Sequence, residues 1–154
     1  MKELEEVILD IARDALADQE RLVAGIRLRT GTLVAAHALV ASFLGTPVLR
    51  DTGLTAPAWL ALTALTAALT LSAVVLWPWD LRFSLPASRI HGRLERRAAH
   101  APPENAGAWM LEAARYHEQA RTRNRPAEKL MARCSGGTAL LLVVQTLAWL
   151  AQMA

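Results

Sequence analysis

Charged residues are missing from three stretches of the chain, and each stretch is about as long as a membrane-spanning helix. The stretches are residues 30–49, 57–79 and 135–154. A lipid core about 30 Å thick needs about 20 helical residues at about 1.5 Å per residue. Lipid leaves backbone groups without water, so only helices and closed barrels cross it, and these stretches lack the alternation of a barrel strand. We therefore predict an all-α integral membrane helical bundle with three transmembrane helices, and a soluble helical bundle is the alternative.

Tryptophans mark both ends of the second stretch. Trp59 and Trp77 are 18 residues apart, which is about 27 Å along a helix. Indole rings favour the membrane–water interface, where one edge is apolar and the other is hydrated. The spacing predicts that Trp59, Trp77 and the following Trp79 are interface anchors, and that the lipid bilayer is the partner of this surface.

Two charged segments flank the uncharged stretches within a single membrane domain of residues 1–154. Residues 1–29 read as a cytoplasmic amphipathic helix, since apolar residues recur at three- to four-residue steps and no proline interrupts them. Residues 80–134 read as a cytoplasmic helical segment, with a break at Pro102–Pro103 and a kink or restart at Pro126. Residues 1–20 carry a net charge of −5 and residues 80–133 a net charge of +5. These opposite charges favour docking of the two segments, and the alternative is two independently solvated surfaces.

The distribution of lysine and arginine predicts the orientation. Residues 1–29 contain five of these residues, the loop at 50–56 contains one, and residues 80–133 contain eleven. Cytoplasmic segments of membrane proteins carry the excess of positive charge. We therefore expect a cytoplasmic N-terminus and a C-terminus outside. The basic pI of about 9.7 follows from this topology and from lipid contact, so we expect no nucleic-acid partner.

Two polar side chains fall inside the uncharged stretches. His37 lies near the middle of the first stretch and Gln145 midway along the last. An ionisable group at that depth faces other helices or water and not lipid. His37 is therefore either a pH-sensitive or pore-lining group, or a neutral imidazole bonded to a Ser or Thr of a neighbouring helix. Gln145 is expected to join helices through its amide, within one chain or in a homo-oligomer.

The remaining polar residues match no motif of catalysis or cofactor binding. His91, His100 and His117 do not have the spacing of a metal site, and Cys134 is the one cysteine. Gly-rich phosphate loops, nucleophile elbows and zinc-protease signatures are absent from the sequence. We expect a protein that is not an enzyme and that uses no cofactor and no metal.

Short motifs at the ends of the predicted helices resemble those of the Pycsar effector family. The segment RLRTGTL at residues 27–33 is similar to the D-x-K-A-G-x-L pattern at the family's first span, with Arg29, Gly31 and Leu33 in matching positions and Arg27 in place of the aspartate. The sequence LWP at residues 76–78 resembles the proline-marked exit of the second span. Lys129 and Arg133 lie where basic residues precede the final span. The layout is more loosely similar to two-span SLATT-type membrane effectors.

The resemblance implies a non-enzymatic bacterial inner-membrane protein with a role in antiviral defence. A companion cyclase would make a cyclic pyrimidine nucleotide during infection, and the effector would then damage the membrane. Binding of this anion implies a set of basic residues, for which the candidates are Arg27, Arg29, Arg93, Arg96 and Arg97. Sensing by a partner protein is equally open. The alternatives are a membrane anchor or assembly subunit, for example of a plasmid-transfer system, and a small channel subunit.

Overall fold

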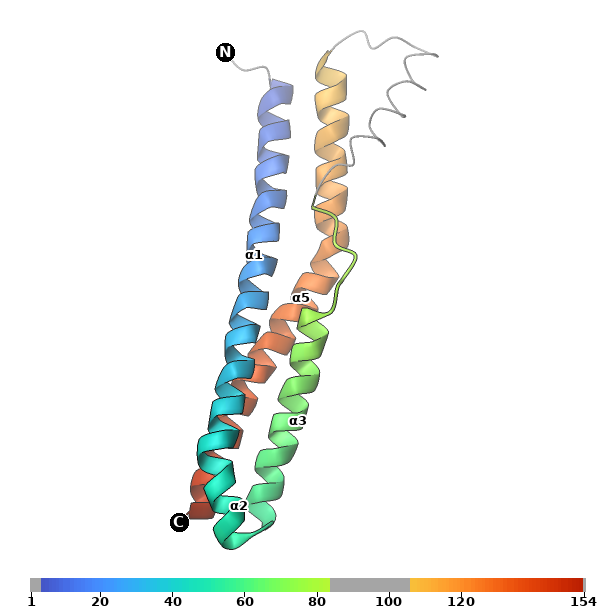
Figure 1. The fold of residues 1–154 in the computed structure, drawn as a ribbon. Helices are drawn as coiled ribbons and strands as arrows, with labels where there is room; N and C mark the ends of the chain where they lie inside the picture. The colour runs from blue at the N-terminus through green and yellow to red at the C-terminus, as the bar shows by residue number, and fades with distance from the viewer. Residues whose placement is uncertain (1–3, 84–105, 154) are drawn as a thin grey trace. The chain divides into compact units, whose positions relative to one another are not determined.

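Helices account for all of the regular secondary structure in the part of the chain that the computed structural model describes, residues 4–83 and 106–153 (Figure 1). In chain order they are α1 (Leu4–Val40), the π-helix η1 (Ala41–Gly45), α2 (Thr46–Thr52), α3 (Ala56–Leu76) and α5 (Ala106–Met153). The prediction of an all-α fold is confirmed.

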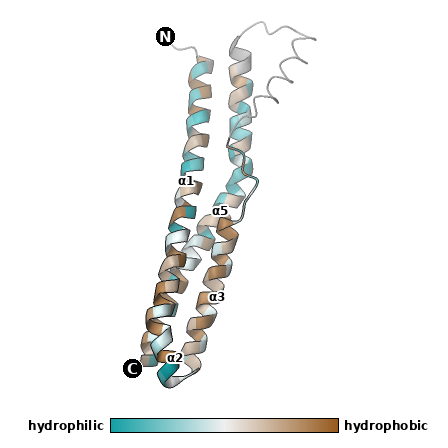
Figure 2. Ribbon diagram, viewed as in Figure 1, coloured by the Kyte–Doolittle hydropathy of each residue, from teal (hydrophilic) through white to brown (hydrophobic). Residues whose placement is uncertain are grey.

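Three of these segments are long and apolar enough to cross a bilayer. They are Glu6–Asp51, Ala56–Leu76 and Met110–Met153. Each contains a hydrophobic stretch of 18 residues with at most two charged residues. Figure 2 shows that hydrophobic residues dominate α3 and the C-terminal parts of α1 and α5. The chain is therefore a multi-pass membrane protein, as predicted. The predicted amphipathic helix runs without a break into the first span as α1, and the rest of that span is formed by η1 and α2. Helix α3 ends at Leu76 instead of residue 79.

The chain divides into two compact units. We call residues 1–22 and 79–126 the charged unit, and residues 23–78 and 127–154 the apolar unit. Helices α1 and α5 contribute residues to both units, and α3 belongs to the apolar unit alone. Each unit is described by itself below.

The first membrane-spanning segment changes its winding before Pro47. Proline has no N–H to donate, and in an α-helix its ring clashes with the carbonyl four residues earlier. The π-turn at Ala41–Gly45 widens the helix just before this position, so the chain stays helical through α2. Gly53 ends α2 with a φ of 72° and donates its N–H to the carbonyl of Leu49 at 3.2 Å.

Helix α5 also contains a proline but does not restart there. Pro126 lies inside its 48 residues, where we expected a kink or a new start. The missing N–H leaves a carbonyl of the preceding turn without a helical donor. The carbonyl that loses its donor is that of Thr122, and in the same turn the Gln19 side chain of α1 donates from Nε2 to the neighbouring carbonyl of Arg121 at 3.2 Å. The break expected at Pro102–Pro103 lies outside the described residues.

In the apolar unit, α1 and α5 run in the same direction and α3 runs against them. Hydrogen bonds join Thr30 to Ser135 and His37 to Gln145, so residue numbers rise together along both helices. Helix α3 buries a face of small residues, which lets neighbouring helices approach closely: Ala58, Ala61, Ala64, Ala68, Ser72 and Val75.

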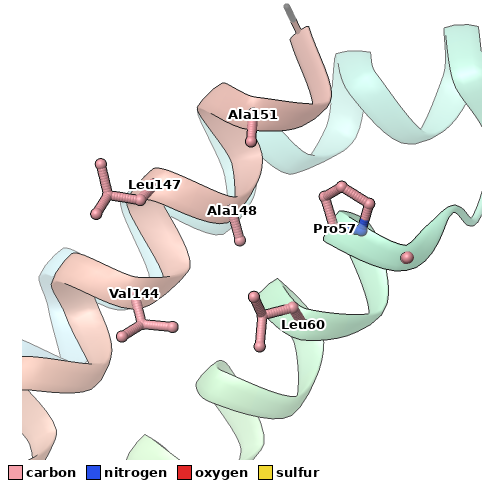
Figure 3. Close-up of a pocket in the computed structure, with 7 residues that line it drawn as sticks. Pro57, Leu60, Val144, Leu147, Ala148 and Ala151 are labelled. Carbon is pink, nitrogen blue, oxygen red and sulfur yellow. The ribbon is translucent and has the colours of Figure 1, made fainter.

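An open apolar groove remains between α3 and α5 near the start of α3. It has a volume of about 490 Å³, and residues from both helices line it (Figure 3): Ala56, Pro57, Leu60, Val144, Leu147, Ala148 and Ala151. The cluster of buried residues beside it contains Val48, Ala58, Ala61, Ala148 and Trp149.

Gly45 allows the closest approach in this cluster. A Cβ atom at Gly45 would lie 2.9 Å from Cζ2 of Trp149, which is itself 1 % exposed. Because the indole is enclosed on all sides, it has little room to move away. The π-turn and α5 can therefore pack in direct contact, because Gly45 has no side chain to collide with Trp149.

We expect Gly45→Ala to lower the free energy of unfolding by about 1–3 kcal/mol, because the added methyl group overpacks the Trp149 site. Gly31→Ala is the matched control, since a Cβ there meets no atom within 4 Å and alanine favours the helix by about 1 kcal/mol. The measurement is loss of helical circular dichroism in detergent micelles titrated with a denaturing detergent. Equal stability of the two variants would contradict the packing described here.

Candidate functional site

The apolar unit buries a line of polar side chains where α1 meets α5. Thr30 and His37 on α1, and Thr138 and Gln145 on α5, are all fully buried. We call these four residues together with Ser135 the polar seam. Buried polar groups in a membrane protein need partners inside the protein because lipid offers none. The seam is therefore the best candidate for a functional site in this unit.

His37 and Gln145 form the centre of the seam. Nδ1 of His37 forms a short hydrogen bond with Oε1 of Gln145, and Nε2 of His37 lies 3.1 Å from the backbone carbonyl oxygen of Thr138. The Gln145 amide also donates from Nε2 to the backbone carbonyl of His37 at 3.3 Å. Three contacts thus join α1 to α5 around one imidazole ring.

The number of protons on the ring decides how many of these contacts form. A neutral imidazole has one N–H, so it donates either to Gln145 or to Thr138, and the imidazolium donates to both. If the Gln145 amide turns over, it can donate to Nδ1, but it then loses its bond to the His37 carbonyl. A neutral ring therefore satisfies two of the three contacts in either arrangement.

Three buried hydroxyls of the apolar unit, those of Thr138, Ser72 and Thr30, depend less on neighbouring helices. Thr138 donates to the carbonyl of Cys134 at 3.0 Å, and Ser72 on α3 donates to the carbonyl of Ala68 at 2.8 Å. Thr30 Oγ1 lies 2.9 Å from the carbonyl of Ile26 and 3.0 Å from Oγ of Ser135. Because these hydroxyls can bond to their own helix, the imidazole and the amide are the seam groups that most require a second helix.

These contacts change the sequence-based interpretation of His37. We expected either a pH-sensitive or pore-lining group, or a neutral imidazole bonded to a Ser or Thr of a neighbouring helix. In the structure the partners of the ring are the Gln145 side chain and the backbone carbonyl of Thr138, so His37 and Gln145 come together although neither was predicted as the partner of the other.

The structure describes some of the predicted basic residues and all of the predicted aromatic anchors. Arg27 is half-buried and donates from Nη2 to the backbone carbonyl of Trp77 at 3.3 Å, while its Nε is buried without a partner. Arg29 is exposed on α1. Arg93, Arg96 and Arg97 lie outside the described residues. Of the predicted anchors, Trp59 and Trp77 are exposed in the apolar unit, and Trp79 is half-buried in the charged unit.

The charged unit has a polar network of its own, centred on Asn124. The Asn124 amide accepts from the backbone N–H of Arg82 at 3.1 Å and donates to the Arg82 carbonyl at 3.0 Å. Its Nδ2 also lies 3.4 Å from Oε1 of Gln19 on α1. One buried amide thus holds the chain that follows α3 and links it to α1.

Among the described residues, His117 is also a buried histidine, and it lies in the charged unit. It is buried, its Nδ1 has no hydrogen-bond partner, and burial together with the nearby positive charge of Arg13 lowers its pKa below the usual 6.5. His117 therefore packs as a neutral ring at neutral pH.

The sequence analysis missed Thr30, Thr138, Gln19 and Asn124, although one signal was available. Buried residues of α5 recur at steps of seven, at His117, Asn124, Met131, Thr138 and Gln145, and those of α1 recur likewise at Leu16, Val23, Thr30 and His37. A seven-residue repeat is typical of helices that pack side by side. The apolar residues at three- to four-residue steps in residues 1–29 follow a different pattern, since Leu4, Ile8, Ile11 and Leu22 are exposed and Ala15 and Ile26 are half-buried.

Within the described residues, no group of three or more His, Cys, Asp or Glu side chains could hold a metal ion. Comparison of the chain with protein-family models, with curated proteins and with solved structures found no match. The geometry of the polar seam is that of a hydrogen-bonded contact that holds α1 and α5 together in an apolar environment.

We expect Gln145→Leu to destabilise the apolar unit by about 1–2 kcal/mol, because it leaves the His37 ring with an unpaired nitrogen in a buried setting. Thr66→Val is the control, since Thr66 is exposed on α3 and bonds to its own helix at the Leu62 carbonyl. Unfolding in mixed micelles, followed by circular dichroism, compares the two. A loss no larger than that of the control would show that the seam adds no stability.

We expect packing of the charged unit to weaken as the pH falls below about 6.5. The pKa of His117 is lowered in the folded chain, so the unfolded chain takes up the proton first, and acid favours unfolding until the pH passes below the folded pKa. Amide hydrogen exchange in α1 between residues 8 and 22, corrected for the intrinsic effect of pH, measures this loss. His117→Leu should remove the part of the pH dependence that belongs to this ring, and an unchanged pH profile in that variant would exclude it as the cause.

Proposed function

We propose that this chain is a non-enzymatic membrane protein that changes the permeability of the bilayer when α1 and α5 separate. The observation that carries the proposal is the hydrogen-bonded pair of His37 and Gln145, which is fully buried within the uncharged stretches of α1 and α5. The resemblance of residues 27–33 and 76–78 to Pycsar effectors agrees with this role.

The physical argument concerns what happens to the pair when the helices part. An unpaired polar group in lipid costs several kcal/mol, so separated imidazole and amide groups are unfavourable unless water reaches them. Separation of α1 from α5 is therefore coupled to hydration of the seam. Three helices per copy are few for a water path, so we propose that several copies act together as a homo-oligomer.

We further propose the inner membrane of a bacterium as the location, with the N-terminus in the cytoplasm. The excess of Lys and Arg in residues 1–29 and 80–133 supports this orientation. The trigger would be a cyclic pyrimidine nucleotide or a partner protein that senses it. Arg27 and Arg29 remain candidates for the contacts to such an anion.

A second candidate function, a membrane anchor or assembly subunit, is favoured by the exposed apolar residues of the charged unit. Leu4 is 70 % exposed and Ile11 is 63 % exposed on a helix that otherwise carries many acids. Apolar side chains in such a segment suit contact with another protein. Such an anchor would hold a stable partner and would leave the membrane intact.

We expect cells that express the chain with a cyclase for cyclic pyrimidine nucleotides to lose their membrane potential and admit an impermeant dye. The double variant His37→Leu with Gln145→Leu should stop the leak, because an apolar seam gives water nothing to hydrate. Gln145→Leu alone should leak at least as much as the parent, since it frees the imidazole. Equal amounts of each variant in the membrane fraction are the control.

An intact potential in all strains, together with a co-purifying partner that Ile11→Arg removes, would replace the effector proposal by the anchor. A leak of equal size in the double variant would show that the seam is not the source of permeability.

A further inference from the structure

One end of the apolar unit gathers positive charge at the level where α3 finishes. We call it the Trp77 end and define it by Arg27, Arg29, Trp77, Lys129 and Arg133. Helix α3 has 21 residues without a charge, about 31 Å, so its ends mark the two surfaces of the lipid core. Trp77 follows α3 directly and is 64 % exposed.

Hydrogen bonds fix the level of these residues within the apolar unit. Arg27 donates to the Trp77 carbonyl, which brings the end of α3 beside α1. The contact between Thr30 and Ser135 sets the register of α1 with α5. Because both helices rise equally per residue, Arg133 lies within about one turn, or about 5 Å along the axis, of Arg27 and Arg29. Lys129 lies one turn farther along α5.

The charge at the Trp77 end is not balanced by the apolar unit itself. The acids of this unit are Asp51 and Glu128, and Asp51 lies at the other end beside Arg50. Glu128 thus stands against four cations, of which Arg29, Lys129 and Arg133 are exposed. A carbonyl holds the Arg27 guanidinium in place without removing its charge, and no carboxylate of the described residues pairs with it.

We propose that the Trp77 end binds the phosphate of an acidic phospholipid, with Arg27, Arg29 and Arg133 as the cationic contacts. The cations lie at headgroup depth, the exposed indole sits at the same level, and the opposite end, with one arginine beside one aspartate, has no such charge. A guanidinium matches the paired oxygens of a phosphate and is already oriented by the Trp77 carbonyl. This site does not depend on the proposed effector function.

The test uses the purified full chain in phosphatidylcholine vesicles that contain a trace of spin-labelled phosphatidylglycerol or spin-labelled phosphatidylcholine. Electron spin resonance measures the fraction of label whose motion the protein restricts. We expect preference for phosphatidylglycerol in the parent protein and a loss of about fivefold in association for each cation removed in Arg27→Gln with Arg29→Gln. The paired change of both residues to lysine should keep most of the preference, and Arg50→Gln at the opposite end should keep all of it.

Equal restriction of the two labels by the parent protein, or an unchanged preference in the double glutamine variant, would overturn the proposal. Displacement of the label by inorganic phosphate, beyond that by sodium chloride of equal ionic strength, would assign the site to a soluble anion instead of a lipid. If the double variant loses helix content by circular dichroism, the exposed Arg133→Gln carries the same test.

Discussion

A polar side chain inside an apolar helix bundle must find its partner on another helix, and this requirement determines how α1 and α5 pack. The His37 ring meets Gln145 and the carbonyl of Thr138, which lie seven residues apart on one face of α5. A slip of α5 by one residue would turn the amide away from the ring and leave both groups unpaired. Polar residues within a seven-residue repeat set the register of coiled coils in the same way, at some cost in stability.

Helix α3 is held by a different principle. Its hydroxyls bond to its own backbone, as Thr66 does to Leu62 and Ser72 to Ala68, so they specify no neighbour. Its buried face is instead made of small side chains that let neighbouring helices approach closely, while hydrogen bonds join its two ends to other helices, from Arg27 to the Trp77 carbonyl and from Thr55 to Gln152. The apolar unit thus combines one helix pair whose register is set by buried hydrogen bonds with a third helix whose buried face is placed by shape. A change in the seam therefore acts first on α1 and α5.

The amount of structure that the sequence predicts follows from the kind of interaction involved. The all-α class and the three spans depend on stretches without charge, which are visible residue by residue. The joining of His37 to Gln145 depends on the register between residues 108 positions apart, which no local pattern supplies. The continuity of α5 through Pro126 was also not predicted, because the contacts of this turn, such as the bond from Gln19 to the Arg121 carbonyl, come from another helix. The spacing of Thr30 and His37, and of Thr138 and Gln145, by seven residues would have indicated the seam.

Among the described residues two histidines are buried, His37 and His117, and their surroundings differ. His37 has partners at both ring nitrogens, so in the apolar unit its hydrogen bonds can be lost only if water or another donor replaces them. His117 packs in the charged unit without a partner at Nδ1, and burial together with the positive charge of Arg13 lowers its pKa. Local opening is therefore easier around His117 than around His37.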